Sequence, residues 1–249
     1  MNRGKIKSYI KSVTPRFIIK IWYSKFSRHD PSIEVGKINL GDLDRTTPFS
    51  VRFGYDRGGP VDRYYIENFL QQKSSFVKGR VLEIGDNAYT LKYGGTKIRQ
   101  SDILHMDATN VHATFIGDLS NAPHIPDNSF DCIILTQTLH LIYNYNEAIE
   151  TCYRILKAGG TLLITVPGIS HIAQDGWGKF WLWSFTANSI QKVLERYFFS
   201  ESIEVATYGN VLVATAFLYG IGMQEIDKKK LDINDPHYQV IITGVAKKS

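Results

Sequence analysis

The sequence predicts an α/β protein, a single doubly wound domain with a seven-stranded, mostly parallel sheet and a short basic N-terminal extension. Short apolar segments alternate with helical ones from residue 80 to the end of the chain. Residues 130–136 (FDCIILT) form a nearly continuous apolar run, which is typical of a central strand covered on both faces. The chain of 249 residues, 43% hydrophobic and 21% charged, is long enough for one large domain.

The expected elements follow from these patterns. Strands are expected at residues 80–84, 97–104, 113–119, 130–136, 161–166, 203–207 and 238–245. Helical patterns cover residues 61–76, 145–156, 189–197 and 211–222. Residues 31–60 are rich in Gly, Pro and Asp, as loops are. We therefore divide the chain into an extension, residues 1–45, and a domain, residues 46–249.

The positive charge is concentrated at the N-terminus. Eight of the 29 Lys and Arg residues lie within the first 28 positions, where no acidic residue occurs, so the remainder has 21 basic and 24 acidic residues. The net charge of +5 is therefore no argument for nucleic-acid binding, and we expect no nucleic-acid partner. Residues 1–30 also carry apolar side chains at helical spacing, so they are either a peripheral membrane contact or a solvated tether.

The compartment is predicted from absent signals. Cys132 and Cys152 lie in apolar and helical patterns, so we expect buried thiols in a reducing environment. No apolar run approaches the ~20 residues of a membrane-spanning helix, and the N-terminus lacks a secretory apolar centre. No His, Asp and Glu cluster has metal-ligand spacing. We expect a cytoplasmic protein, with membrane-peripheral attachment as the alternative, and no metal.

Three acidic residues accompany successive strands. Glu83 lies in an otherwise apolar strand, Asp102 follows it by 19 residues near the expected end of the second strand, and Asp118 ends the third. Ligands of open α/β sheets bind beyond the carboxyl ends of the strands. In that order the carboxylates suit an ammonium group, ribose hydroxyls and an adenine amine, and Gly85 permits a close backbone approach. Helix N-capping is the alternative role for Asp102 and Asp118.

Residues 81–168 resemble the cofactor-binding half of class I S-adenosylmethionine-dependent methyltransferases. The resemblance rests on residues 117–119 (GDL), 125–131 (IPDNSFD), 156–160 (LKAGG) and 162–163 (LL). It implies the Rossmann-like methyltransferase fold and S-adenosylmethionine as cofactor. With the strand-end argument above, it gives these cofactor-binding candidates: Glu83, Gly85, Asp86, Asp102, Asp118, Leu119, Gln137 and Thr138.

A narrower resemblance covers roughly residues 45–245. Residues 53–70, the turn at 84–86 and residues 135–142 (LTQTLHLI) are similar to a bacterial methyltransferase subgroup. Its members are often encoded beside, or fused to, glycosyltransferases of surface-polysaccharide synthesis. The resemblance implies a small-molecule or glycan acceptor and a glycosyltransferase as a partner.

The chain departs from the family at the first turn. The family usually has Gly-x-Gly-x-Gly there, whereas this chain has Gly85-Asp86-Asn87-Ala88-Tyr89. Asn tolerates positive φ and Ala is small, so the turn is expected to survive. The change disfavours a NAD dehydrogenase, because a pyrophosphate needs the second glycine, whereas S-adenosylmethionine has no phosphate.

Catalytic and acceptor-binding candidates flank this region. His140 follows the fourth strand and is the candidate general base, with a packed or capping histidine as the alternative. Arg57 or Arg63 could pair with the methionine carboxylate, or with Asp56 and Asp62 instead. An aromatic-rich segment, residues 171–185, suits stacking on sugar rings or, equally, core packing. The substrate-binding candidates are Arg57, Arg63, Tyr64, His171, Trp177 and Trp181.

Three functions remain open on the sequence. The first is O-methylation of a sugar or glycan intermediate. The second is a degenerate methyltransferase domain that serves as an interaction module, which the missing glycines favour. The third is an RNA methyltransferase whose basic N-terminus binds phosphates. No Asn/Asp-Pro-Pro-aromatic or Pro-Cys motif of DNA-methylating enzymes occurs in the chain.

Overall fold

A computed structural model of the chain describes residues 33–249, and the predicted tether or membrane contact of residues 1–30 lies outside them. The chain divides into two compact units, Met1–Thr46 and Thr47–Ser249. Within the first unit, the described residues are almost all exposed and include one 3-10 turn, η1 (Gly41–Leu43). The second unit contains the sheet and the α-helices described below.

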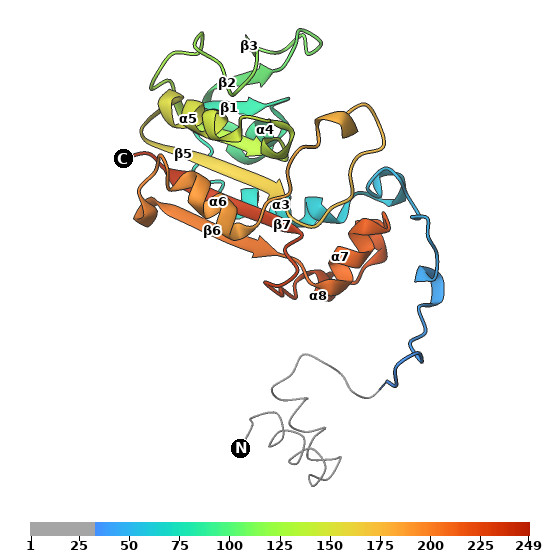
Figure 1. Ribbon diagram of the computed structural model, residues 1–249. Coiled ribbons are helices and arrows are strands. Elements are labelled where there is room, and N and C mark those ends of the chain that lie inside the picture. The colour runs from blue at the N-terminus through green and yellow to red at the C-terminus, as the bar shows by residue number, and fades with distance from the viewer. Residues whose placement is uncertain (1–32) are drawn as a thin grey trace, which may run out of the picture. The chain divides into compact units, whose positions relative to one another are not determined.

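The second unit is built on one seven-stranded sheet, in the order β3-β2-β1-β4-β5-β7-β6 (Figure 1). The strands are β1 (Gly79–Ile84), β2 (Ile98–His105), β3 (Phe115–Ile116), β4 (Phe130–Thr136), β5 (Leu156–Pro167), β6 (Ile203–Tyr208) and β7 (Ile241–Lys247). Strands β1 to β5 pair in parallel, and β7 runs antiparallel to both β5 and β6. This confirms the predicted doubly wound, mostly parallel α/β fold.

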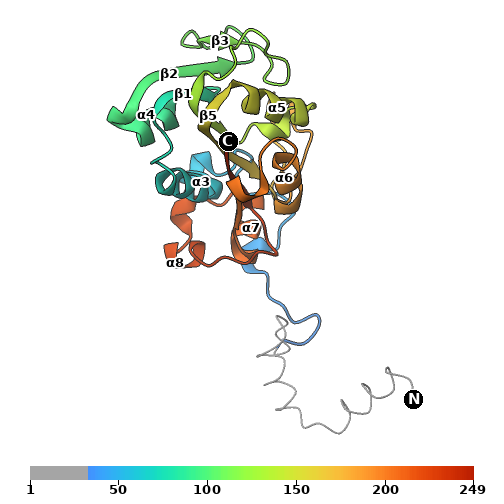
Figure 2. The same ribbon diagram turned by 90° about the vertical axis from the view of Figure 1, so that its left-hand side faces the viewer.

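Helices cover both faces of the sheet (Figure 2). They are α3 (Val61–Gln72), α4 (Ala88–Gly94), α5 (Tyr145–Ile155), α6 (Ala187–Leu194), α7 (Val211–Leu218) and α8 (Lys228–Leu231). One core cluster joins α5 and α6 to one face, and a second joins α3, α4 and α7 to the other. Because β4 is buried between these two clusters, its sequence is apolar at nearly every position.

Several element boundaries differ from the sequence expectation, among them those of the third and fifth strands. The third strand was expected over residues 113–119 but contains only Phe115 and Ile116. Polar side chains fold the preceding segment into tight turns instead, since Asp107 accepts from the Thr109 amide and Asn110 from the His112 amide. The fifth strand begins at Leu156, before the two glycines that were expected to separate it from the helix.

Other sequence expectations concern single residues and segments. Cys132 and Cys152 are fully buried thiols. Among residues 33–249, no helix combines the length and the apolar character needed to cross a bilayer. Over the same residues, no group of three or more His, Cys, Asp and Glu side chains is arranged to hold a metal ion.

Candidate functional site

The turn after β1 lies where the strand order reverses, between β1 and β4. Gly85 has a φ of 93°, and a Cβ added to it would meet nothing within 4 Å. Its amide donates to the Leu104 carbonyl at 2.9 Å, and its carbonyl accepts from Asn110 Nδ2 at 2.8 Å. The turn is therefore fixed by β2 and the following loop, while the space beside its Cα is open to a ligand.

The rest of this turn shows why the second and third glycines of the Gly-x-Gly-x-Gly pattern are not needed here. Asn87 has a φ of −130° and forms the N-cap position of α4. Its side chain donates to Ser101 Oγ at 3.1 Å, and Asp86 Oδ1 accepts from the Ala88 amide at 2.9 Å. From Asp86 to Tyr89 no residue has a positive φ, so only the first glycine is required by the backbone.

Glu83 was expected to pair with an ammonium group, and in the structure its carboxylate bonds to the protein backbone instead. Its side chain is 2% exposed, and both carboxylate oxygens face the first turn of α4. They accept from the Tyr89 amide at 3.2 Å and from the amide and hydroxyl of Thr90, each at 2.7 Å. Burial raises the pKa of Glu83 to about 7, against the lowering effect of these hydrogen bonds. Glu83 thus ties β1 to α4.

Asp102 does not lie at the end of its strand, and the sequence expectation was wrong on this point. It pairs in register with Leu82, inside the sheet, and β2 continues to His105. The residue is 1% exposed, and its side chain accepts from Arg80 Nε at 2.8 Å and from Gln100 Nε2 at 3.2 Å. The buried carboxylate is an ion-pair partner within the sheet, held away from the carboxyl edge.

The first carboxylate beyond β2 is Asp107, which the sequence analysis missed. The register places Leu104 level with Ile84, so Asp107 follows β2 at the same edge as Gly85. Its Oδ1 accepts from the Thr109 amide and hydroxyl, which lower the pKa of Asp107, with His105 adding a smaller effect. The side chain is 62% exposed, so it is accessible to a ligand. The register was the missing information, because two acids lie five residues apart here.

Asp118 and Leu119 separate into a surface and a core position. Asp118 follows β3, and its Oδ1 accepts from the Ser120 amide at 2.8 Å. Its other oxygen has no hydrogen-bond partner within residues 33–249. Leu119 is 3% exposed and belongs to the core cluster of α5 and α6, so its side chain packs inward instead of lining a pocket.

Gln137 and Thr138 follow β4 at the same edge as Gly85. Gln137 has a φ of 48°, which is uncommon for a residue with a side chain. Its amide donates to the Thr165 carbonyl and its Nε2 to Thr165 Oγ1, at 2.9 and 3.2 Å. Thr138 Oγ1 donates to the Thr136 carbonyl at 2.9 Å. The two residues form a rigid turn between β4 and the 3-10 turn η4 (Leu139–Leu141).

His140 lies on η4 and is 2% exposed. Burial lowers the pKa of His140 to about 4, so the imidazole is neutral at neutral pH. Its ring centroid lies 4.4 Å from that of Trp181, and its carbonyl accepts from the Leu182 amide at 3.0 Å. Nδ1 is buried and has no hydrogen-bond partner among residues 33–249.

His171 and Trp181 are brought together by Phe53, which the sequence analysis did not single out. The Phe53 ring stacks on His171 at 3.9 Å and 18°, and lies 6.0 Å from Trp181 at 11°. With His140 against Trp181, the four rings form an aromatic row past the carboxyl ends of β4 and β5. Trp177 is not part of this row, because its side chain is 57% exposed and packs on Phe180.

The arginine candidates have partners within the protein. Arg57 forms a bidentate pair with Glu225 instead of with Asp56. Arg63 donates to the hydroxyls of Tyr55 and Tyr89, the latter in the first turn of α4.

Tyr64 and Asp62, which lie beside Arg63 in the sequence, have the following surroundings in the structure. Tyr64 donates to Asp232, which follows α8, and so is occupied away from the turn at Gly85. Asp62, the alternative partner of Arg63, is half-buried, and desolvation raises the pKa of its carboxyl to about 6. Arg57 and Tyr64 thus bond to side chains near the C-terminal helices, while Arg63 bonds to Tyr89 of α4.

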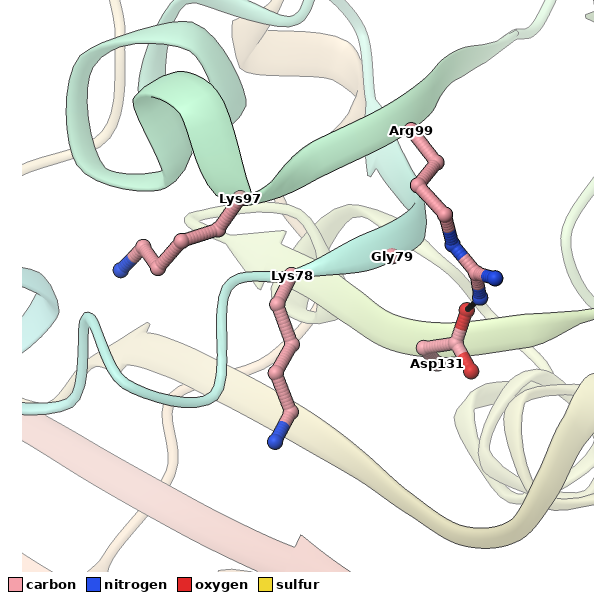
Figure 3. A pocket seen from close by; sticks show the side chains of 5 residues that line it. All are labelled: Lys78, Gly79, Lys97, Arg99 and Asp131. Atoms are coloured by element: carbon pink, nitrogen blue, oxygen red, sulfur yellow. Dashed lines mark hydrogen bonds and ion pairs between the residues drawn. The ribbon is translucent and has the colours of Figure 1, made fainter.

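A cavity of about 320 Å³ lies at the opposite edge of the sheet (Figure 3). It is lined by residues at or near the amino ends of β1, β2 and β4, namely Lys78, Gly79, Lys97, Arg99 and Asp131. Asp131 is already engaged by Lys157 at 2.9 Å and by Arg99 at 3.2 Å. Because parallel strands bind ligands at their carboxyl ends, this cavity is not the expected cofactor site.

Comparison with known proteins relates part of the chain to a sequence family. Residues 72–164 match the sequence profile of the family described as "Methyltransferase domain". Residues 72–164 are therefore similar to a methyltransferase domain, and the open turn at Gly85 lies within this region.

Two curated relatives share part of this domain. The ubiquinone/menaquinone biosynthesis C-methyltransferase UbiE of Pectobacterium carotovorum subsp. carotovorum (strain PC1) is 33% identical over 86 residues, 34% of this chain and 32% of that protein. UbiE of Haemophilus ducreyi is 31% identical over 88 residues, 34% of this chain and 31% of that protein. The match therefore spans about a third of the length of these relatives.

The fold of the chain also resembles that of solved structures. A SAM dependent methyltransferase from Archaeoglobus fulgidus aligns with a TM-score of 0.51 and 14% identity, over 75% of this chain and 94% of that one. At this identity the likeness shows the shared fold. The family match ends at residue 164, before His171 and Trp181.

Proposed function

We propose that the protein transfers the methyl group of S-adenosylmethionine to a hydroxyl of a sugar or glycan intermediate. The observation that carries the methyl-transfer part is the turn at Gly85, open to a ligand and fixed at the reversal of strand order. The carboxylates of Asp107 and Asp118 follow the neighbouring strands β2 and β3 and have oxygens without protein partners in the described part of the chain. These groups suit the ribose hydroxyls and adenine amine of the cofactor.

The residues present fit such a cofactor. Gly85 allows close approach, and Asp86, Gln137 and Thr138 surround the same edge through fixed turns. When bound, S-adenosylmethionine supplies an electrophilic methyl group on a sulfonium. The protein's own task is to orient the acceptor oxygen in line with that group and to exclude water.

His140 is the proposed proton acceptor for the hydroxyl. Because its pKa is lowered to about 4, the ring is in the neutral form that can accept a proton at neutral pH. The same shift makes it a weak base, so orientation of the hydroxyl contributes more than basicity. Its buried Nδ1 without a partner is available for a hydrogen bond.

The sugar acceptor rests on the aromatic row and on the sequence resemblance to polysaccharide-linked methyltransferases. Phe53, His171 and Trp181 lie outside the region matched by the methyltransferase family, so the relatives' acceptor is not carried over to this chain. Aromatic faces beside hydrogen-bonding nitrogens suit a ring that has both apolar faces and hydroxyls. A glycosyltransferase partner is part of the same proposal, through the supply or use of the glycan.

Calorimetric titration with S-adenosylmethionine and S-adenosylhomocysteine, with NADH as the control ligand, tests the cofactor. We expect micromolar binding of the two sulfur compounds and none of NADH. Failure of a folded protein to bind either sulfur compound would refute the proposal. The acceptor is tested by following S-adenosylhomocysteine release with methyl glycosides and nucleotide sugars against phenols. Turnover with phenols alone would refute the sugar assignment and leave methyl transfer intact.

A further inference from the structure

The aromatic row contains one ring that comes from outside the strand ends. His140 and His171 each follow a strand, β4 and β5, and Trp181 lies in the segment after β5. Phe53 comes from the segment before α3 and lies nearly parallel to both His171 and Trp181, at 18° and 11°. The Phe53 ring therefore fills a space for one flat ring beside the rings of His171 and Trp181.

The backbone at Phe53 is in an unfavourable conformation. Its φ of 57° is left-handed, which is uncommon for a bulky side chain. The segment is nevertheless fixed on both sides, because the Gly54 amide donates to Ser50 Oγ at 3.3 Å and the Gly59 carbonyl accepts from the Met223 amide at 2.8 Å. Because the backbone is held, the place of the Phe53 ring is vacated only by rotation of its side chain.

The same region contains three imidazole nitrogens without partners. His140 Nδ1, His171 Nδ1 and His171 Nε2 are buried and have no hydrogen-bond partner among residues 33–249. A neutral imidazole has one donor and one acceptor, and leaving either unpaired in a buried place is unfavourable. The hydrocarbon ring of Phe53 cannot pair with any of them. A ligand with a ring of the same size and a hydroxyl can.

We propose that the place of the Phe53 ring is a binding slot for a six-membered ring carrying a hydroxyl. Phe53 rotates out, the ligand ring packs against Trp181, and its hydroxyl bonds to an imidazole nitrogen of His171 or His140. Identification of this ligand as the methyl acceptor rests on the proposed function, whereas the slot itself does not. A sugar and a phenol share the required chemistry, and separate ligands distinguish them.

The test uses Phe53→Ala, which removes the ring and leaves a space of its size. Calorimetry with phenol and with benzene, on the full chain, compares a ring with and without a hydroxyl. In a purely apolar cavity phenol binds less well than benzene, because its hydroxyl stays unpaired. We expect Phe53→Ala to bind phenol about tenfold more tightly than benzene, and about tenfold more tightly than wild type does, since no ring must be displaced.

Matched variants keep this test decisive. Phe180→Ala makes the same substitution at an exposed ring outside the slot, and we expect it to bind phenol as wild type does. Phe53→Gly tolerates the left-handed φ and replaces Phe53→Ala if that variant does not fold. His171→Leu and His140→Leu, each added to Phe53→Ala, show which nitrogen holds the hydroxyl, as the phenol preference is lost in one of them.

Three results would overturn the slot. They are benzene binding as tightly as phenol to Phe53→Ala, binding of neither compound, and a phenol preference that survives both histidine substitutions together. Methyl β-D-glucopyranoside in parallel separates a sugar ligand from an aromatic one. S-Adenosylhomocysteine titrated into the same samples distinguishes failure of the proposed function from failure of the slot. Absence of cofactor binding refutes the proposed methyltransferase activity and has no bearing on the slot.

Discussion

Asp102 within β2 and Asp107 just beyond it should respond differently to alanine substitution. Asp102 is 1% exposed and accepts from Arg80 Nε at 2.8 Å, while Asp107 is exposed and bonds only within its own turn and to His105. The carboxylate of Asp102 supports the sheet. The carboxylate of Asp107 lies at the carboxyl edge of the sheet, where the proposed cofactor site is.

The size of the effect follows from burial. Removing one partner of a buried ion pair costs about 3 to 5 kcal/mol, because the remaining charge is unpaired. The Arg80 side chain is 28% exposed and recovers some hydration, so we expect about 2 kcal/mol of lost unfolding free energy for Asp102→Ala. With a urea dependence of about 1–3 kcal/mol per M, the unfolding midpoint falls by about 1 M. For Asp107→Ala we expect an unchanged midpoint.

Urea unfolding and calorimetric titration of S-adenosylhomocysteine, on the same preparations, measure the two effects. Asp107→Ala should weaken cofactor binding about tenfold or more, as expected for loss of a charged acceptor. Asp102→Asn keeps the side-chain shape and controls for packing. A stable Asp102→Ala protein that no longer binds the cofactor would refute the register argument and return Asp102 to the ligand site.

Three further predictions concern single positions. Gly85→Ala should lower the unfolding free energy by about 1–3 kcal/mol, because the φ of 93° is unfavourable for alanine. It should also bind the cofactor more weakly, because the added Cβ enters the open space beside the turn. Unchanged binding by calorimetry would show that the cofactor does not contact this turn. Since the pKa of His140 falls from 6.5 to about 4 on folding, the unfolded chain binds this proton more readily between these values, so the His140 contribution to the unfolding free energy falls by about 3 kcal/mol as the pH is lowered through this window. The raised pKa values of Glu83 and Asp62 act in the opposite direction over the same range, so the test is the difference between wild type and His140→Leu. Relative to wild type, the urea midpoint of His140→Leu should rise as the pH is lowered, and parallel profiles would contradict this. Arg57→Ala breaks an exposed pair with Glu225 and should leave the cofactor dissociation constant unchanged, whereas a clear loss of affinity would show that Arg57 reaches the methionine carboxylate.

The apolar runs of the sequence determined the sheet because a strand buried on both faces has little freedom in composition. Residues 130–136 were expected as a strand, and β4 has the same bounds. The third strand was predicted too long. Its pairing with β2 covers only Phe115 and Ile116, and the Asx turns before it leave no periodic signal in the sequence.

The sequence by itself determined the fold class, the open turn at Gly85 and the presence of acids near the strand ends. Only the tertiary structure decided which acid is exposed at the carboxyl edge, because the register between β1 and β2 places Asp102 level with Leu82 and Asp107 beyond the end of β2. It also decided that Phe53 lies against His171, 118 positions further along the chain. Periodicity reports which face of an element is buried, but contacts between distant loops depend on how the packed sheet and helices bring those loops together.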